Sequence, residues 1–110
     1  MNTVPTSMRI RLCIEDMQRN RIPLFDGVVA LLKLVEQVPP LAGDRDVQAL
    51  ERLLDEVEHL PIGEAREMWE AKALHRADRE LMELERRHRD TVFYACRRLV
   101  RTLDTLPPGV

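Results

Sequence analysis

The sequence predicts an all-α protein in which three short helices pack on one long C-terminal helix. Apolar residues make up 45% of the 110 residues and aromatic residues only 4%, which is typical of a helical core built from Leu, Val, Ile and Met. Apolar residues recur at helical spacing in segments separated by prolines. Residues 62–106 contain no proline and one glycine, Gly63. We therefore expect one helical domain over residues 1–110, with a flexible leader at residues 1–6.

Residues 8–15 fit two patterns. Apolar side chains at alternate positions indicate a half-buried strand, whereas Ile10, Ile14 and Met17 follow the i, i+4, i+7 spacing of a helix. The polar residues after Ile14, and Ser7 as a possible cap, favour the helix. A strand would need a partner strand, most simply the same segment of a second chain.

Residues 23–38 form the most apolar of the expected helices. Apolar side chains cover most of its circumference, so we expect it to be buried on several sides. Asp26 is the candidate N-cap, and the two prolines at positions 39 and 40 end the helix.

A third helix should follow a short loop and continue to His59. Asp44 or Asp46 is its candidate N-cap. Its leucine and valine side chains form one stripe, and its acidic side chains form the opposite face. This is the pattern of an ordinary amphipathic helix with one face on the core.

Residues 62–106 are expected to form one helix, entered through Pro61. It would be roughly 65 Å long at ~1.5 Å per residue, whereas a compact chain of this length has a radius of gyration of about 13 Å. The two preceding helices could cover less than half of its apolar stripe. We therefore expect a homodimer. Its seam would contain Leu74, Leu81, Leu84, His88 and Val92.

The first turns of this helix should present a second apolar face, turned by roughly 100° from the stripe. Trp and Met are enriched in interface cores, which makes Trp69 and Met68 candidates for binding a different protein. Alternatively, Trp69 covers the core of its own chain. The predicted partner-binding face contains Ile62, Ala65, Met68, Trp69 and Ala73.

Two Glu-x-x-His pairs, Glu56 with His59 and Glu85 with His88, match part of the ligand inventory of a di-iron four-helix bundle. The geometry argues against a di-metal protein, because His59 points almost opposite the apolar stripe of its helix. We expect no metal, no cofactor and no enzymatic activity. For His88, on the apolar stripe, a hydrogen bond at a helix interface is the expected environment.

The alternative function is nucleic-acid binding through an arginine-rich face in residues 86–101. That segment carries six Arg against Asp90, whereas residues 44–58 carry six acids against two Arg, and the chain has a formal net charge of −2. A solvated face, or pairing with the acidic third helix, is therefore favoured over nucleic acid. The residues of this face are Arg86, Arg87, Arg97, Arg98 and Arg101, with Tyr94 among them.

Cellular location can be predicted from two features of the sequence. Cys13 and Cys96 do not make a disulfide framework, and the N-terminus lacks the apolar core of a signal peptide. No apolar run approaches the ~20 residues of a membrane-spanning helix. We expect a cytoplasmic protein without a membrane segment.

Two segments of the chain resemble those of a known protein family. They are the proline-punctuated RIPLFDGVVALLKLVEQVPP and the arginine-rich closing helix MWEAKALHRADRELMELERRHRDTVFYACRRLVRTL. In these and in its size the chain resembles the small bacterial antiactivators that bind LuxR-type quorum-sensing transcription regulators. The resemblance implies a helical dimer that attaches to a regulator and prevents it from dimerising or binding DNA. It agrees with the expectation of a non-enzymatic regulatory protein that acts by protein–protein interaction.

Overall fold

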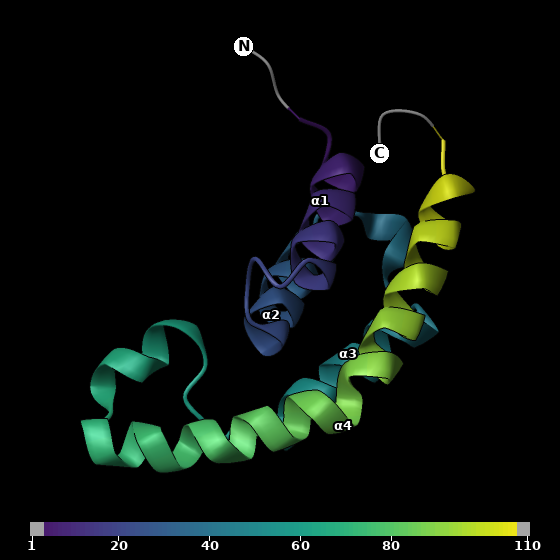
Figure 1. The fold of residues 1–110 in the computed structure, drawn as a ribbon. Helices are drawn as coiled ribbons and strands as arrows, with labels where there is room; N and C mark the ends of the chain where they lie inside the picture. The colour runs from purple at the N-terminus through teal and green to yellow at the C-terminus, as the bar shows by residue number, and fades with distance from the viewer. Residues whose placement is uncertain (1–3, 108–110) are drawn as a thin grey trace.

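The computed structural model describes residues 4–107 and confirms the all-α fold (Figure 1). Three short helices pack with one long helix, and residues 8–15 are helical. No strand occurs within residues 4–107, and no helix there is long and apolar enough to cross a membrane. The elements are α1 (Thr6–Gln18), α2 (Leu24–Val35), the 3-10 helix η1 (Pro39–Leu41), α3 (Arg45–Glu56), the 3-10 helix η2 (Gly63–Met68) and α4 (Ala71–Asp104).

The first two helices begin directly after prolines. Pro5 precedes α1, so the expected leader ends one residue earlier than predicted, and its residues 1–3 lie outside the described residues. Pro23 is the N-cap of α2 with φ −60° and ψ 148°. Asp26 therefore lies in the first turn of α2 rather than at its cap, where its charge still suits the positive end of the helix dipole.

Helix α3 is capped as predicted by one of its two candidates. The Asp44 carboxylate accepts hydrogen bonds from the backbone N–H groups of Asp46 (2.8 Å) and Val47 (3.1 Å). The helix ends at Glu56, three residues before the predicted end at His59. A turn follows instead, in which the Leu60 N–H donates a hydrogen bond to the Val57 carbonyl (2.9 Å). The turn is favoured over a continued helix because it buries the side chains of both Val57 and Leu60.

The predicted helix over residues 62–106 is wrong at its start. Gly63 adopts φ +62°, residues 63–68 form η2, and Trp69 is extended, so α4 begins only at Ala71. The 34 residues of α4 still run through the whole molecule, which measures 48 Å along its longest axis. Helix α4 curves, with its concave side towards α1 and α2 (Figure 1), as long helices do when they wrap round a core.

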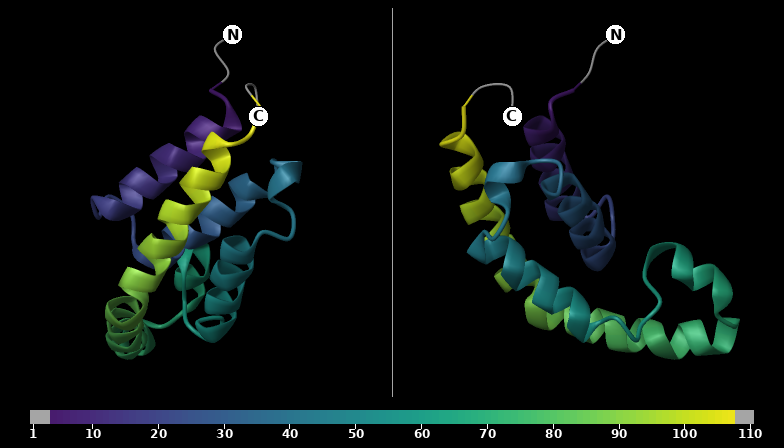
Figure 2. Two further views of the ribbon diagram at one scale, coloured as in Figure 1. Left: turned by 90° about the vertical axis from the view of Figure 1, so that its right-hand side faces the viewer. Right: turned by 180° about the vertical axis from the view of Figure 1, so that it is seen from behind.

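The curvature of α4 places most of its apolar stripe in the core. Helix α3 runs along the middle of α4, and α1 lies opposite the C-terminal part (Figure 2). Val92 is fully buried and Leu81 is only 9% exposed within the single chain. Leu84 is partly buried and packs against the same core.

Leu81 and Val92 of the predicted dimer seam are instead buried within the core of the single chain. His88 faces α3, and only Leu74 lies towards the end of α4 that reaches beyond the other three helices. A homodimer stays a prediction, but it can no longer be argued from an uncovered stripe.

Candidate binding site at the arm

Residues 61–70, here called the arm, fold back against the first turns of α4 at one end of the molecule (Figures 1 and 2). One ion pair holds this position. The Arg66 guanidinium donates to both carboxylate oxygens of Asp78, at 2.7 Å and 3.0 Å, and its Nη1 also lies 3.5 Å from the Pro61 carbonyl. The hydrogen bonds from Arg66 lower the pKa of Asp78, so this anchor is charged at neutral pH.

A cleft of about 410 Å³ lies between the arm, the N-terminal end of α2 and α4. Phe25, Ile62 and Met82 contribute apolar walls. Asp26 and Glu85 also line the cleft, and neither forms an ion pair with another residue in the described chain. The cleft can therefore receive an apolar group that carries a positive charge.

Burial raises the pKa of Glu85, with Arg89 opposing the shift and the nearby Asp26 adding to it. A raised pKa means that the folded state binds this proton more readily than the unfolded state, so the ionised carboxylate reduces stability at neutral pH. We expect Glu85→Gln to raise the melting temperature slightly at pH 7, and the advantage to disappear below about pH 4, where the carboxyl is protonated in both states. Thermal melts followed by circular dichroism at the two pH values measure this.

Glu58→Gln is the matched control for that measurement, because Glu58 is exposed on the turn after α3. It should change the melting temperature little at either pH. A loss of stability in Glu85→Gln at pH 7 would mean that attraction to Arg89 outweighs the burial of Glu85.

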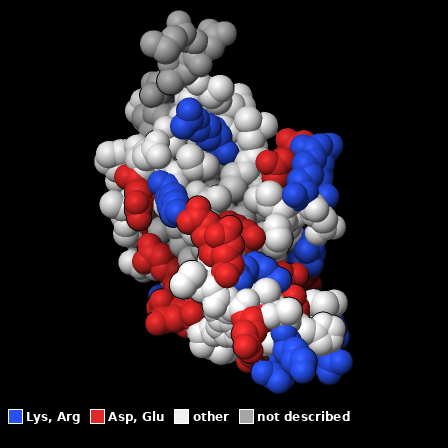
Figure 3. Space-filling view, turned by 90° about the vertical axis from the view of Figure 1, so that its left-hand side faces the viewer, with Lys and Arg blue, Asp and Glu red and all other residues white. Residues whose placement is uncertain are grey.

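The predicted partner-binding residues do not share one helix face, because residues 62–69 are not α-helical. They separate into two groups. Met68 is 87% exposed and Trp69 37% exposed, with Ala65 exposed beside them, whereas Ile62 and Ala73 are partly buried. Figure 3 views the end of the molecule that carries the arm, where uncharged surface lies between acidic and basic groups.

Sequence reasoning missed most of the residues that line this cleft, Met82 and Asp26 among them. Met82 is 63% exposed and lines the cleft, and Asp26 reaches the cleft from α2. Met82 follows the stripe residue Leu81 directly, so its apolar side chain in an outward position was the available signal. No sequence signal placed Asp26 there, because its position depends on how α2 packs.

Each histidine of the two Glu-x-x-His pairs contacts a glutamate outside its own pair. His88 Nε2 lies 3.2 Å from Glu56 Oε2, and His59 Nε2 lies 3.2 Å from Glu80 Oε1. The contact of His59 has hydrogen-bond geometry. The hydrogen bond expected for His88 is not formed by its buried Nε2, which approaches Glu56 without that geometry. One contact joins Glu56, the last residue of α3, to α4, and the other joins His59, in the turn after α3, to α4. Among residues 4–107, no three His, Cys, Asp or Glu side chains lie close enough together to hold a metal ion.

The two cysteines, Cys13 and Cys96, are free and buried. Burial raises the pKa of Cys96 to about 12 and also raises that of Cys13. Both thiols are therefore protonated at neutral pH, and neither has the thiolate character of a nucleophile.

The arginines of the predicted arginine-rich face have different surroundings in the structure. Arg98 donates to the buried Asp46 carboxylate at 2.7 Å and 3.0 Å and lies over the Tyr94 ring, 4.6 Å from its centre. This is the expected pairing with the acidic third helix. Arg86 pairs with Glu83 on α4 itself at 3.4 Å. Arg97 and Arg101 instead line a groove between α4 and α1.

Comparison with known proteins found no match among curated proteins and none among solved structures. A family model described as "Protein of unknown function (DUF2489)" matches residues 6–99. The match covers α1, α2, α3, the arm, the cleft and most of α4. The chain therefore belongs to the DUF2489 family.

Proposed function

We propose that this protein is a non-enzymatic regulatory protein that acts by binding another protein through the arm. The supporting observation is the exposure of Met68 and Trp69 side by side, on a segment held away from the core. Large apolar side chains exposed together on a small protein are typical of an interaction surface. The anchor between Arg66 and Asp78 fixes the arm in advance, which reduces the entropy lost on binding.

The cleft beside the arm extends this surface. A partner would offer an apolar pocket to Trp69 and a basic side chain to Asp26 and Glu85, which face the cleft without an ion pair from residues 4–107. The apolar walls of the cleft would strengthen that charge pairing by keeping water away from it.

A transcription regulator is the partner class that we propose, with this protein acting as an antiactivator in the cytoplasm. The resemblance to bacterial antiactivators of quorum-sensing regulators supports this class. Charge supports it too, because DNA-binding proteins carry basic surfaces and an acidic cleft is complementary to them. Occupying such a surface would block the regulator from DNA or from its own dimer partner.

Trp69→Ala tests the proposal. Truncating a buried interface tryptophan commonly costs about 2 kcal/mol or more, so we expect partner binding to weaken at least roughly thirtyfold. The tagged full chain is used to capture partners from the native cell, the captured proteins are identified by mass spectrometry, and the affinity for the purified partner is then measured.

Tyr94→Ala is the matched control, since Tyr94 is a 55% exposed aromatic residue on α4 away from the arm. Circular dichroism should show that both variants keep the helical content of the unmodified chain. Equal partner affinity for Trp69→Ala and the unmodified chain would exclude the arm as the binding surface.

A further inference from the structure

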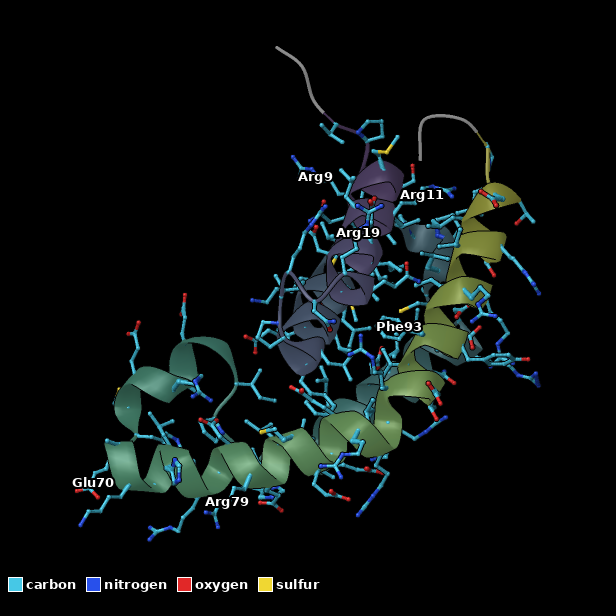
Figure 4. The ribbon with its side chains drawn as sticks, in the orientation of Figure 1. Arg9, Arg11, Arg19, Glu70, Arg79 and Phe93 are labelled. Atoms are coloured by element: carbon cyan, nitrogen blue, oxygen red, sulfur yellow. The ribbon has the colours of Figure 1, made fainter. Side chains whose placement is uncertain are left out.

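We propose that the groove between α1 and α4 is a binding site for a discrete phosphate-bearing ligand. The groove encloses about 560 Å³, which lies within the range of small-molecule sites. Four arginines line it: Arg11 from α1, Arg19 directly after α1, and Arg97 and Arg101 from α4. Figure 4 shows Arg11 and Arg19 along α1, with Phe93 on the facing part of α4.

Two contacts between α1 and α4 mark the ends of this groove. Near the C-terminus of α4, Arg11 Nη2 lies 2.6 Å from Asp104 Oδ1. Towards the middle of α4, Arg89 Nη2 donates to Asn20 Oδ1 at 2.9 Å, just beyond the end of α1. The two helices are therefore antiparallel here, and the groove has a limited length. This favours a discrete ligand over a polymer that would continue past both ends.

The positive charge of the groove is only partly balanced from within residues 4–107, because Arg11 pairs with Asp104 and Arg19 with Glu15. Arg97 and Arg101, one turn apart on α4, form no ion pair or side-chain hydrogen bond with residues 4–107. Glu15 is the acidic residue in the lining, and it pairs with Arg19 at 3.2 Å. Both partners of that pair are exposed, so the pair contributes little and Arg19 can turn to a ligand.

Phosphate chemistry fits this arrangement better than a carboxylate does. A guanidinium presents paired N–H groups that match two phosphate oxygens, and a phosphate ester or polyphosphate carries enough charge to engage arginines on both helices. A single carboxylate would neutralise only one of them. Ile14, Cys96 and Val100 supply an apolar floor for the organic part of such a ligand.

Isothermal titration calorimetry on the full chain at low ionic strength tests the site with two probes, inorganic tripolyphosphate and ATP. We expect saturable binding of at least one probe. The double variant Arg97→Gln with Arg101→Gln should weaken that binding by about tenfold or more, because it removes charge-assisted hydrogen bonds from one wall. Its melting temperature should stay the same or rise, since two like charges are removed from a shared groove.

The matched control is Arg76→Gln with Arg79→Gln, which removes the same charge from the opposite end of α4 (Figure 4). It should leave the affinity within about twofold. Absence of binding by both probes, or an equal loss in the two double variants, would overturn the site.

A 12-nucleotide single-stranded oligonucleotide, titrated in the same way, separates the two sources of phosphate. Binding of the oligonucleotide alone, lost in the groove variant, would overturn the discrete ligand and make the groove a nucleic-acid contact. The site is independent of the arm, so Trp69→Ala should bind tripolyphosphate as the unmodified chain does.

Discussion

Val92→Asp is expected to unfold the protein at every concentration. Val92 is completely buried in the middle of α4, and an unpaired carboxylate there loses its hydration without gaining a partner. A buried, uncompensated charge costs about 3–5 kcal/mol, which is a large part of the roughly 5–15 kcal/mol that stabilises a small domain. Circular dichroism and urea titration should show a non-native chain, and sedimentation should show no folded species.

Leu74→Asp is the matched comparison, because Leu74 lies on the same helix and belongs to the same predicted seam but is only partly buried. It should remain folded and lose about 1 kcal/mol or less. A folded but dissociated Val92→Asp would instead restore the intermolecular seam that the sequence indicated.

Local signals in the sequence predicted the short helices well. The aspartate at the N-cap of α3 acts within a few residues, so its effect can be deduced without knowing the tertiary contacts. The caps predicted for the first two helices, Ser7 and Asp26, are wrong, because prolines occupy the N-cap positions of α1 and α2. The apolar spacing of residues 8–15 fitted both a strand and a helix, and the polar residues after Ile14 favoured the helix that the structure contains.

The arm could not be predicted in this way. Its Glu, Ala, Arg and Met residues all favour an α-helix, so local preference extended α4 back to residue 62. The chain instead turns at Gly63, and Arg66 reaches across to Asp78. The contact between Arg66 and Asp78 joins residues twelve positions apart. Tertiary contacts of this kind override weak local helix propensity.

The candidate sites depended on tertiary arrangement still more strongly. The sequence indicated Trp69 and Met68 as candidates for partner binding, and both side chains are exposed in the structure. It assigned Leu81 and Val92 to an outer seam because the curvature of α4 was unknown. The arginine groove requires α1 to lie antiparallel to α4, which brings Arg11 close to Asp104, 93 residues away. No pattern within either helix encodes that pairing.

The position of α1 depends on Gly27 in α2. Gly27 is buried, and the Cys13 thiol donates to its carbonyl at 3.6 Å. A Cβ at this position would lie 2.8 Å from Met17 Sδ and closer still to Met17 Cγ. Met17 is 1% exposed and has little room to move, so a larger residue at position 27 must push α1 away from α2.

Gly27→Val should therefore destabilise the fold by about 3 kcal/mol, at the upper end of the usual overpacking cost, as measured by urea titration. Ala30→Val is the control, because Ala30 is exposed on the same helix and should lose only a few tenths of a kcal/mol, roughly its helix propensity. Adding Met17→Ala to Gly27→Val should cost less than the sum of the two single changes, since the new side chain would occupy the space that Met17 leaves. Strict additivity would mean that the two residues do not compete for one space. Because Arg11 lies on α1 and Arg19 directly after it, a shift of α1 in Gly27→Val should also weaken tripolyphosphate binding in whatever fraction stays folded.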